Sequence, residues 1–288
     1  MGSRLIIPAL AGMLVLTGLI PASAQGVPQL WGSVTIDKDM KKGFDASVST
    51  EYRSLDNFSG TDRWSVGIDL SKRFYRTKDQ TFTVKGSLGM KYMNVFNPAE
   101  LKSKADGIDD GHDEQFYIDN KYNYNKTCEY WQGRMRYMAS VSAKKSLGNL
   151  GISLRERFQY TTRDSISLQK VKNRYPMVFD STLDDFVQGD LKQTSETELK
   201  PAKNSSVLRS RLQVDYKFKK AGLTPFVLAE FFSDLDNGFS LAKTRVSAGT
   251  EYKVNKRNGL ELEFIWQDSN DDDEPAGYAM FLGYTYSF

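Results

Sequence analysis

The chain has 288 residues, a formal net charge of +3 and a mean hydropathy of −0.51, with 26% charged and 12% aromatic residues. A charge so close to balance argues against nucleic acid, or any electrostatically steered partner, as a ligand. The single cysteine, Cys128, excludes an intrachain disulfide and a thiolate metal site.

The N-terminus has the pattern of a secretory signal peptide. Arg4 precedes an apolar run from Leu5 to Ile20, and Pro21 and three small residues at 22–24 follow. A positive region, an apolar region and a small-residue cleavage site occur in this order in signal peptides. An anchoring helix is the alternative, but the run is short for a bilayer span of about 20 residues. We therefore expect residues 1–24 to be removed and residues 25–288 to form one domain.

Apolar and polar residues alternate at period two along most of the remaining chain, which indicates strands with one apolar and one polar face. After Trp64, for example, Val66, Ile68 and Leu70 share a face. The predicted strands cover residues 44–54, 64–74, 82–92, 132–145, 150–161, 208–218, 223–233, 243–254, 260–267 and 278–288.

Two strands break the alternation. Glu156 falls among apolar residues in 150–161, and Glu230 lies between aromatic neighbours in 223–233. A β-bulge at either glutamate would return its side chain to the polar face.

The connections between these strands alternate between short turns and long or acidic segments. The two longest are 94–130 and 163–205. Outer-membrane barrels combine short periplasmic turns with longer external loops. The alternation therefore predicts an antiparallel up-and-down barrel of ten strands from Phe44 to Phe288, with both ends of that sequence on the periplasmic side.

Two further segments leave the strand number open. Residues 30–37 also have a strand pattern, but one extra strand gives an odd count, which bacterial single-chain barrels avoid. Residues 115–124 could supply a twelfth strand. We expect ten strands plus an N-terminal strand of open placement, with twelve strands as the alternative.

The last strand indicates what surrounds the barrel. Tyr278, Met280 and Leu282 share one face, and the same face ends in Tyr284, Tyr286 and Phe288. An apolar face with aromatic residues at both ends suits contact with lipid. A soluble β-sandwich would alternate similarly, but the signal peptide, the long strands and the aromatic ending favour a transmembrane barrel. Phe288 is expected to be the residue that completes closure in the membrane.

Several of the predicted strands contain segments that together resemble a known family. They are Leu30-Trp31, LRERFQY at 154–160, LRSRLQVDYKF at 208–218, LTPFVLAEFF at 223–232, RVSAGTEYKVNKRNGLELEF at 245–264 and DDDEPAGYAMFLGYTYSF at 271–288. On these segments the chain is similar to the outer-membrane barrel family called domain of unknown function 2490, found largely in Bacteroidetes-type bacteria. The resemblance implies an outer-membrane β-barrel and no assigned activity. It also implies that 94–130 and 163–205 are insertions relative to the compact form of the family.

Charged residues on the polar faces are the candidate functional residues. Because a charge facing lipid costs up to about 2–4 kcal/mol near the midplane, they should point into the barrel. One hypothesis is an ion-pair network that fills the lumen of a narrow barrel. The other is a ladder that selects charged solutes in a pore. The residues are Glu51, Arg134, Arg136, Arg155, Arg157, Arg209, Arg211, Arg245, Glu251, Glu261 and Glu263.

Two acidic segments, 268–274 and 109–114, have spaced oxygen ligands. The first lacks the Gly and Glu that a calcium loop needs at its sixth and twelfth positions, where Asp273 and Ala279 stand. Solvated acidic loops are therefore expected, and no metal or cofactor is predicted.

His112, the single histidine, lies in a predicted external loop. A Ser-His or Asp-His mechanism would need that loop to bring a nucleophile or water to it. An outer-membrane hydrolase is therefore the third hypothesis, and we expect the protein not to be an enzyme.

These patterns predict an outer-membrane barrel with a structural or interaction role and a charged, filled lumen; a narrow pore for small solutes is the alternative. The expected partners are outer-membrane lipid and the barrel-assembly machinery. The long loops could bind an external glycan or protein, because function concentrates in loops on rigid scaffolds. In one of them Cys128 could be an unpaired thiol or an intermolecular link.

Overall fold

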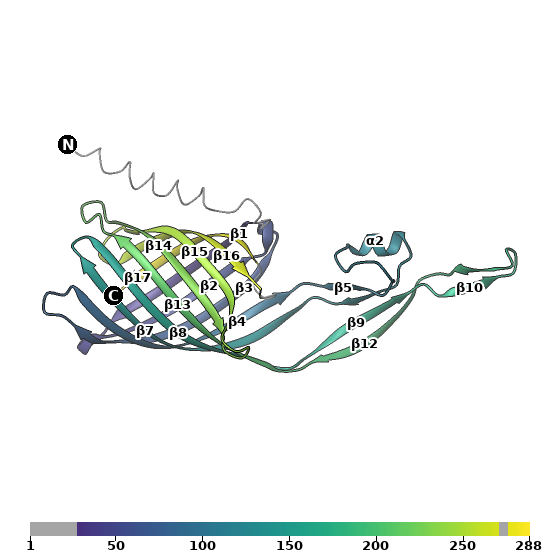
Figure 1. Cartoon of the computed structure of the whole chain (residues 1–288), viewed down its shortest axis with the longest axis horizontal. Helices are drawn as coiled ribbons and strands as arrows, with labels where there is room; N and C mark the ends of the chain where they lie inside the picture. Colours follow the sequence, from purple (N-terminus) through teal and green to yellow (C-terminus); the bar gives the residue numbers. More distant parts are fainter. Residues whose placement is uncertain (1–27, 271–275) are drawn as a thin grey trace. The chain divides into compact units, whose positions relative to one another are not determined.

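The computed structural model describes residues 28–270 and 276–288, so the predicted signal-peptide boundary at residue 24 lies outside the described residues. Within them, eleven strands close into a barrel (Figure 1). All ten predicted segments form barrel strands, which confirms the all-β barrel fold. The strands are β1 (Pro28–Asp39), β2 (Phe44–Ser54), β3 (Thr61–Arg76), β4 (Phe82–Asn97), β7 (Tyr130–Leu147), β8 (Leu150–Arg163), β13 (Lys203–Tyr216), β14 (Leu223–Asp234), β15 (Ser240–Lys253), β16 (Asn258–Ser269) and β17 (Gly277–Ser287).

The N-terminal strand, whose placement the sequence left open, closes the barrel. β1 pairs antiparallel with β2 and parallel with β17, where Pro28 is opposite Tyr278 and Asp37 is opposite Ser287. The strand count is therefore eleven, between the two expected values. An odd number of consecutive antiparallel strands can close only if the first and last run in parallel, and β1 provides that pair. Phe44 and Phe288 lie at the same end of the barrel, but Pro28 starts at the opposite end.

Short and long connections alternate along the barrel as predicted. The end with short turns carries the 3-10 turn η1 (Lys41–Gly43) and the two-residue turn at 148–149, in which Gly148 has φ of 66°. Glycine adopts this left-handed conformation without steric cost. The other end carries η2 (Asp56–Phe58) and the longer segments.

The outer surface of the barrel is apolar and its interior is polar. Val48 pairs with both Ile36 and Ile68. Val48 is 50% exposed, and the two isoleucines are each 47% exposed. The alternate positions Arg63 and Ser65 are only 5% and 2% exposed. Directly paired residues share one face of a sheet. This arrangement is the reverse of a soluble β-sandwich, which buries its apolar faces.

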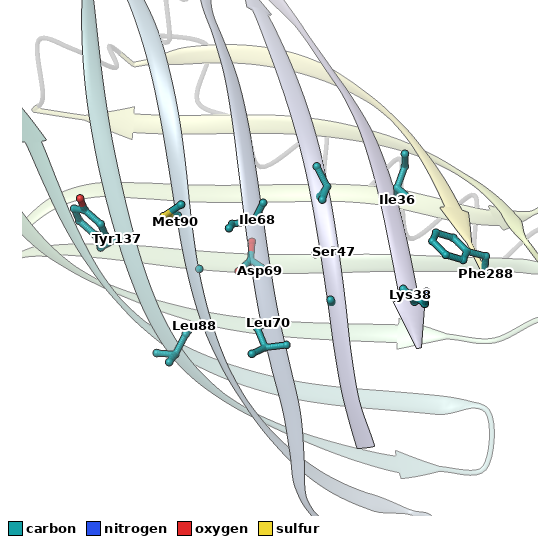
Figure 2. Close-up of a pocket in the computed structure, with 13 residues that line it drawn as sticks. Ile36, Lys38, Ser47, Ile68, Asp69, Leu70, Leu88, Met90, Tyr137 and Phe288 are labelled. Atoms are coloured by element: carbon teal, nitrogen blue, oxygen red, sulfur yellow. The ribbon is translucent and has the colours of Figure 1, made fainter. Parts of the chain in front are cut away.

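A shallow apolar hollow lies in this outer wall. Figure 2 shows Ile68 and Leu70 of β3 beside Leu88 and Met90 of β4, with Tyr137 of β7 next to them. Such an apolar surface belongs against another apolar phase.

Glu230 lies inside the barrel without a bulge. It pairs directly with Arg211 of β13 and Arg245 of β15, and the register shift in β14 falls between Phe232 and Ser233. The predicted bulge at Glu230 is therefore wrong. The inward face of β14 is itself largely apolar, which is why the alternation looked broken.

Glu156 remains on the outer face. Its Oε2 accepts a hydrogen bond of 2.6 Å from Oγ of Ser210, and Ser210 pairs with Phe231, which is 44% exposed. The prediction that Glu156 returns to the interior is therefore wrong, because a hydroxyl on a neighbouring strand satisfies its carboxylate instead.

Residues 94–134 and 162–203 form a second compact unit, inserted in the β4–β7 and β8–β13 connections. A four-stranded sheet has the order β12-β9-β6-β5, and β10 and β11 form a separate hairpin. These segments were predicted as polar loops, so the structure corrects that prediction. The elements are β5 (Glu100–Ser103), α2 (Glu114–Asp119), β6 (Tyr124–Thr127), β9 (Ile166–Arg174), β10 (Met177–Asp180), β11 (Asp185–Gln188) and β12 (Lys192–Lys200).

The alternative twelfth strand at 115–124 is mostly helix and turn. Asp113 caps α2, and its side chain accepts a hydrogen bond from the backbone N–H of Phe116 at 2.8 Å. The core of this unit is aromatic: Tyr117 and Tyr124 are 0% and 1% exposed, with ring centroids 5.1 Å apart. In the part of the chain that the structure describes, no helix has the length and apolar character to cross a membrane.

Candidate functional site: the charged barrel interior

Most of the predicted inward charges line one cavity of about 330 Å³ inside the barrel. Strands β2, β7, β8, β13, β15 and β16 each contribute at least one of them. The predicted residues at this cavity are Glu51, Arg136, Arg155, Arg157, Arg209, Arg211, Arg245, Glu261 and Glu263.

Two predicted residues lie elsewhere. Glu251 is exposed and pairs across strands with Glu261. Arg134 is buried, 7% exposed, and belongs to the second compact unit. Glu251 and the nine residues at the cavity belong to the barrel unit.

Glu230 is the centre of the interior network, although the sequence did not predict it as a site residue. Its side chain is fully buried, and four arginines lie within 4 Å of its carboxylate. The nitrogen–oxygen distances are 3.0 Å from Arg155, 2.7 Å from Arg209, 3.2 Å from Arg211 and 3.7 Å from Arg245.

The register of the sheet explains this cluster. Arg211 and Arg245 are the cross-strand partners of Glu230, so opposite charges face each other directly. Arg209 is two residues from Arg211 and shares its face, and Arg155 reaches Glu230 from β8. A buried carboxylate needs such partners to remain charged. The sequence could have indicated Glu230 as an interior residue if the inward face of β14 had been allowed to contain both apolar and charged residues.

A second ion-pair group lies on β2 and β4. Glu51 binds Arg53 at 2.6 Å and Lys91 at 3.1 Å. The guanidinium of Arg53 stacks 3.8 Å from the ring centroid of Trp31, and that of Arg245 lies 4.9 Å from the same ring. These cation–π contacts connect β1 to the charged network.

Apolar side chains also occupy the interior. Phe226, Leu228 and Phe232 of β14 are 5–6% exposed and pair with inward residues of β13. The ring of Phe232 lies 4.5 Å from the Arg209 guanidinium and 4.4 Å from Nζ of Lys243. Arginine and lysine side chains and these rings therefore pack against one another inside the barrel.

A second interior cavity of about 460 Å³ is lined only by basic and neutral residues. It shares Arg155 and Arg211 with the first cavity, so these two arginines lie between them. Its other basic residues are Arg73, Arg76, Lys85 and Lys144. The linings of both cavities therefore contain more basic than acidic residues.

The remaining predicted motifs lie in the second unit or partly outside the described residues. His112 stacks on Phe116 with ring centroids 3.8 Å apart. Asp110 accepts a hydrogen bond from the backbone N–H of Ser103 and Glu114 binds Lys126, so these carboxylates stabilise local structure. Cys128 is a free, half-buried thiol.

The acidic segment 268–274 lies partly outside the described residues, at 271–274. Among residues 28–270 and 276–288, no group of three or more His, Cys, Asp or Glu could hold a metal ion.

The fold and its interior define a closed β-barrel with an apolar outer wall and a basic, arginine-rich lumen. The profile of one protein family, described as protein of unknown function (DUF2490), matches residues 28–276. The chain belongs to this family.

One solved structure similar to the chain is the translocator domain of the autotransporter NalP from Neisseria meningitidis. The two share 11% sequence identity with a TM-score of 0.26, over 91% of each chain. No curated protein matches the sequence.

Proposed function

We propose that this protein is an integral outer-membrane β-barrel with a structural or interaction role and a lumen blocked by its own side chains. The observation that carries the proposal is the outer wall: large apolar side chains are exposed on every strand of the barrel, while charges are buried inside. A hydrocarbon phase is the solvent that makes such a surface stable. Residues 1–24 would direct export.

The proposed orientation places the short turns in the periplasm and the long connections outside. The second compact unit would then be external, where it could bind a glycan or a protein. Its exposed hairpin side chains support an interaction role, because Val178, Phe179 and Phe186 are 48%, 51% and 60% exposed. Outer-membrane lipid and the barrel-assembly machinery would be the other partners.

The proposal that the lumen is blocked depends on Glu230 and the four arginines around it. Arg155 and Arg211 separate the two interior cavities, and both are held by Glu230. A barrel of eleven strands is narrow, so a bridge of this kind occupies its cross-section.

The test combines membrane fractionation with electrical recording. The full-length protein should fractionate with outer membranes and migrate differently on gels before and after heating. The purified barrel should give no steady current in a planar bilayer. Recovery as a soluble periplasmic protein without detergent would overturn the proposal.

A narrow pore for small solutes is the second candidate, favoured by the two basic cavities. In that case the same recording would give a steady current selective for anions. The proposal also includes that the protein is not an enzyme and needs no cofactor; lipid or peptide hydrolysis that is lost in His112→Ala would contradict it.

A further inference from the structure

Four arginines on two neighbouring strands face the same interior cavity. Arg155 and Arg157 belong to β8, and Arg209 and Arg211 belong to β13, which is its neighbour in the sheet. We call these four residues the arginine cluster. Four like charges repel one another in a confined space of low dielectric constant unless anions neutralise them.

Glu230 neutralises only part of this cluster. It binds Arg155, Arg209 and Arg211, but it carries one negative charge and is shared with Arg245. Arg157 has no ion pair within 4 Å among the described residues, and its hydrogen bond runs from Nη1 to Sδ of Met138 at 3.8 Å. A thioether is a weak acceptor for a guanidinium.

Hydrogen-bond donors without acceptors also belong to the arginine cluster. The Nε atoms of Arg155, Arg157 and Arg209 are buried and have no hydrogen-bond partner among the described residues. Buried polar groups in proteins are nearly always hydrogen-bonded, so an unmet set of this size calls for an acceptor. That acceptor should be negative, because the donors are cationic.

The cavity has room for a small anion together with water. Its volume of about 330 Å³ is roughly ten times the 30 Å³ that one water occupies in the liquid. Asp69, Glu261 and Glu263 also line the cavity, and the charge of Asp69 acts on Arg155 and Arg157. The lining still contains nine basic residues against these three carboxylates and Glu51, so it favours an anion.

We propose that the arginine cluster binds a small multivalent oxyanion, of the sulfate or phosphate type, inside the barrel. The planar guanidinium presents paired N–H groups that match the oxygen spacing of such anions. Sulfate or phosphate would supply acceptors for the unmet Nε groups and offset the excess positive charge. The site would lie in the lumen. Anion binding there is expected whether or not the barrel conducts ions.

The experiment is calorimetric titration of the full-length barrel in detergent with sodium sulfate and then with inorganic phosphate, at constant ionic strength. Arg157→Gln is the test variant because Arg157 is outside the Glu230 ion pairs. Arg257→Gln is the matched control, since Arg257 is exposed in the β15–β16 turn. Folding of each variant is checked by heat-dependent gel migration.

Saturable binding is expected for the wild type and for Arg257→Gln, with at least about tenfold weaker binding in Arg157→Gln. No saturable binding to the wild type, or equal binding by both variants, would overturn the proposal. If Arg157→Gln does not fold, anomalous diffraction from wild-type crystals soaked in selenate decides. A selenium peak beside the arginine cluster supports the site, and its absence contradicts it.

Discussion

The backbone N–H of Phe288 donates a hydrogen bond to the carbonyl oxygen of Asp37 at 3.1 Å. This contact joins the last residue to the end of the first strand, beyond the parallel register that ends with Asp37 opposite Ser287. Nζ of Lys38 lies 5.0 Å from the ring centroid of Phe288. The final aromatic residue therefore takes part in closing the barrel at its seam.

Deletion of Phe288 should impair barrel assembly more than deletion of one residue from the 163–205 insertion. The first removes the terminal contact of the β1–β17 seam, whereas Thr182 lies in the exposed turn of the β10–β11 hairpin. Heat-dependent gel migration of membrane fractions measures the assembled share. Equal assembly of the Phe288 and Thr182 deletions would argue against a closure role for Phe288.

Glu230→Ala should lower the free energy of unfolding by about 3–5 kcal/mol, because it leaves buried arginines without their shared carboxylate. Urea unfolding of the barrel in lipid vesicles measures the change. Glu198→Ala is the control, since Glu198 forms a solvent-exposed pair with Lys170 whose loss should leave the stability nearly unchanged. A Glu230→Ala effect as small as the control would show that the network is not the core of the lumen.

Glu156 and Ser210 should behave as a coupled pair on the outer wall. Ser210→Ala should destabilise the barrel by about 1.5–3 kcal/mol, because it removes the hydrogen bond to a carboxylate among apolar residues. Glu156→Leu should be neutral or stabilising, since it removes the charge itself.

The double variant Glu156→Leu/Ser210→Ala tests this coupling. It should be close to Glu156→Leu alone in vesicle unfolding. If the two single effects simply add, the pair is not coupled and the assigned outer-face contact is wrong.

Alternation was enough to predict ten barrel strands, because all of them except β8 and β14 keep one polar and one apolar face over most of their length. It could not place β1, since its pattern is the same whether it pairs with β17 or lies apart. The parallel closure depends on the register between residues about 250 positions apart, such as Pro28 and Tyr278. Local sequence does not encode that register.

Glu230 was missed for a different physical reason. The alternation pattern was interpreted on the assumption that every inward-facing residue of the barrel is polar. In β14, however, Phe226, Leu228 and Phe232 face inward together with Glu230. The strands of the second unit were missed because they lack apolar alternation. β12 reads KQTSETELK and pairs antiparallel with β9, and charged side chains such as Glu198 and Lys170, 2.8 Å apart, lie across the two strands.

Two glycines should respond differently to alanine. A Cβ at Gly249 would lie 2.5 Å from the carbonyl oxygen of Leu262 and 3.0 Å from Cα of Glu263, and both are backbone atoms that cannot rotate away. Gly249→Ala should therefore cost about 1–3 kcal/mol. At Gly32 the nearest atom, the carbonyl oxygen of Leu282, is 3.9 Å away, so Gly32→Ala should change stability by less than about 0.5 kcal/mol. Vesicle unfolding compares them, and similar losses would contradict the tight β15–β16 packing.

The second unit should lose stability at alkaline pH through Tyr124. Its hydroxyl donates to Oε1 of Glu114 at 3.1 Å, and burial, reinforced by the negative charge of Glu114, raises the pKa of Tyr124 above its ordinary 10.0. A raised pKa means that the folded state keeps a proton that the unfolded chain releases. The stabilisation is therefore complete below pH 10.0 and decreases as the pH rises further. Tyrosine ionisation is followed by ultraviolet absorbance as the pH is raised, in the wild type and in Tyr124→Phe. The absorbance change that the variant lacks belongs to Tyr124, and it should occur well above pH 10.0. If that absorbance change occurs near pH 10.0, the pKa of Tyr124 is not raised as the structure indicates.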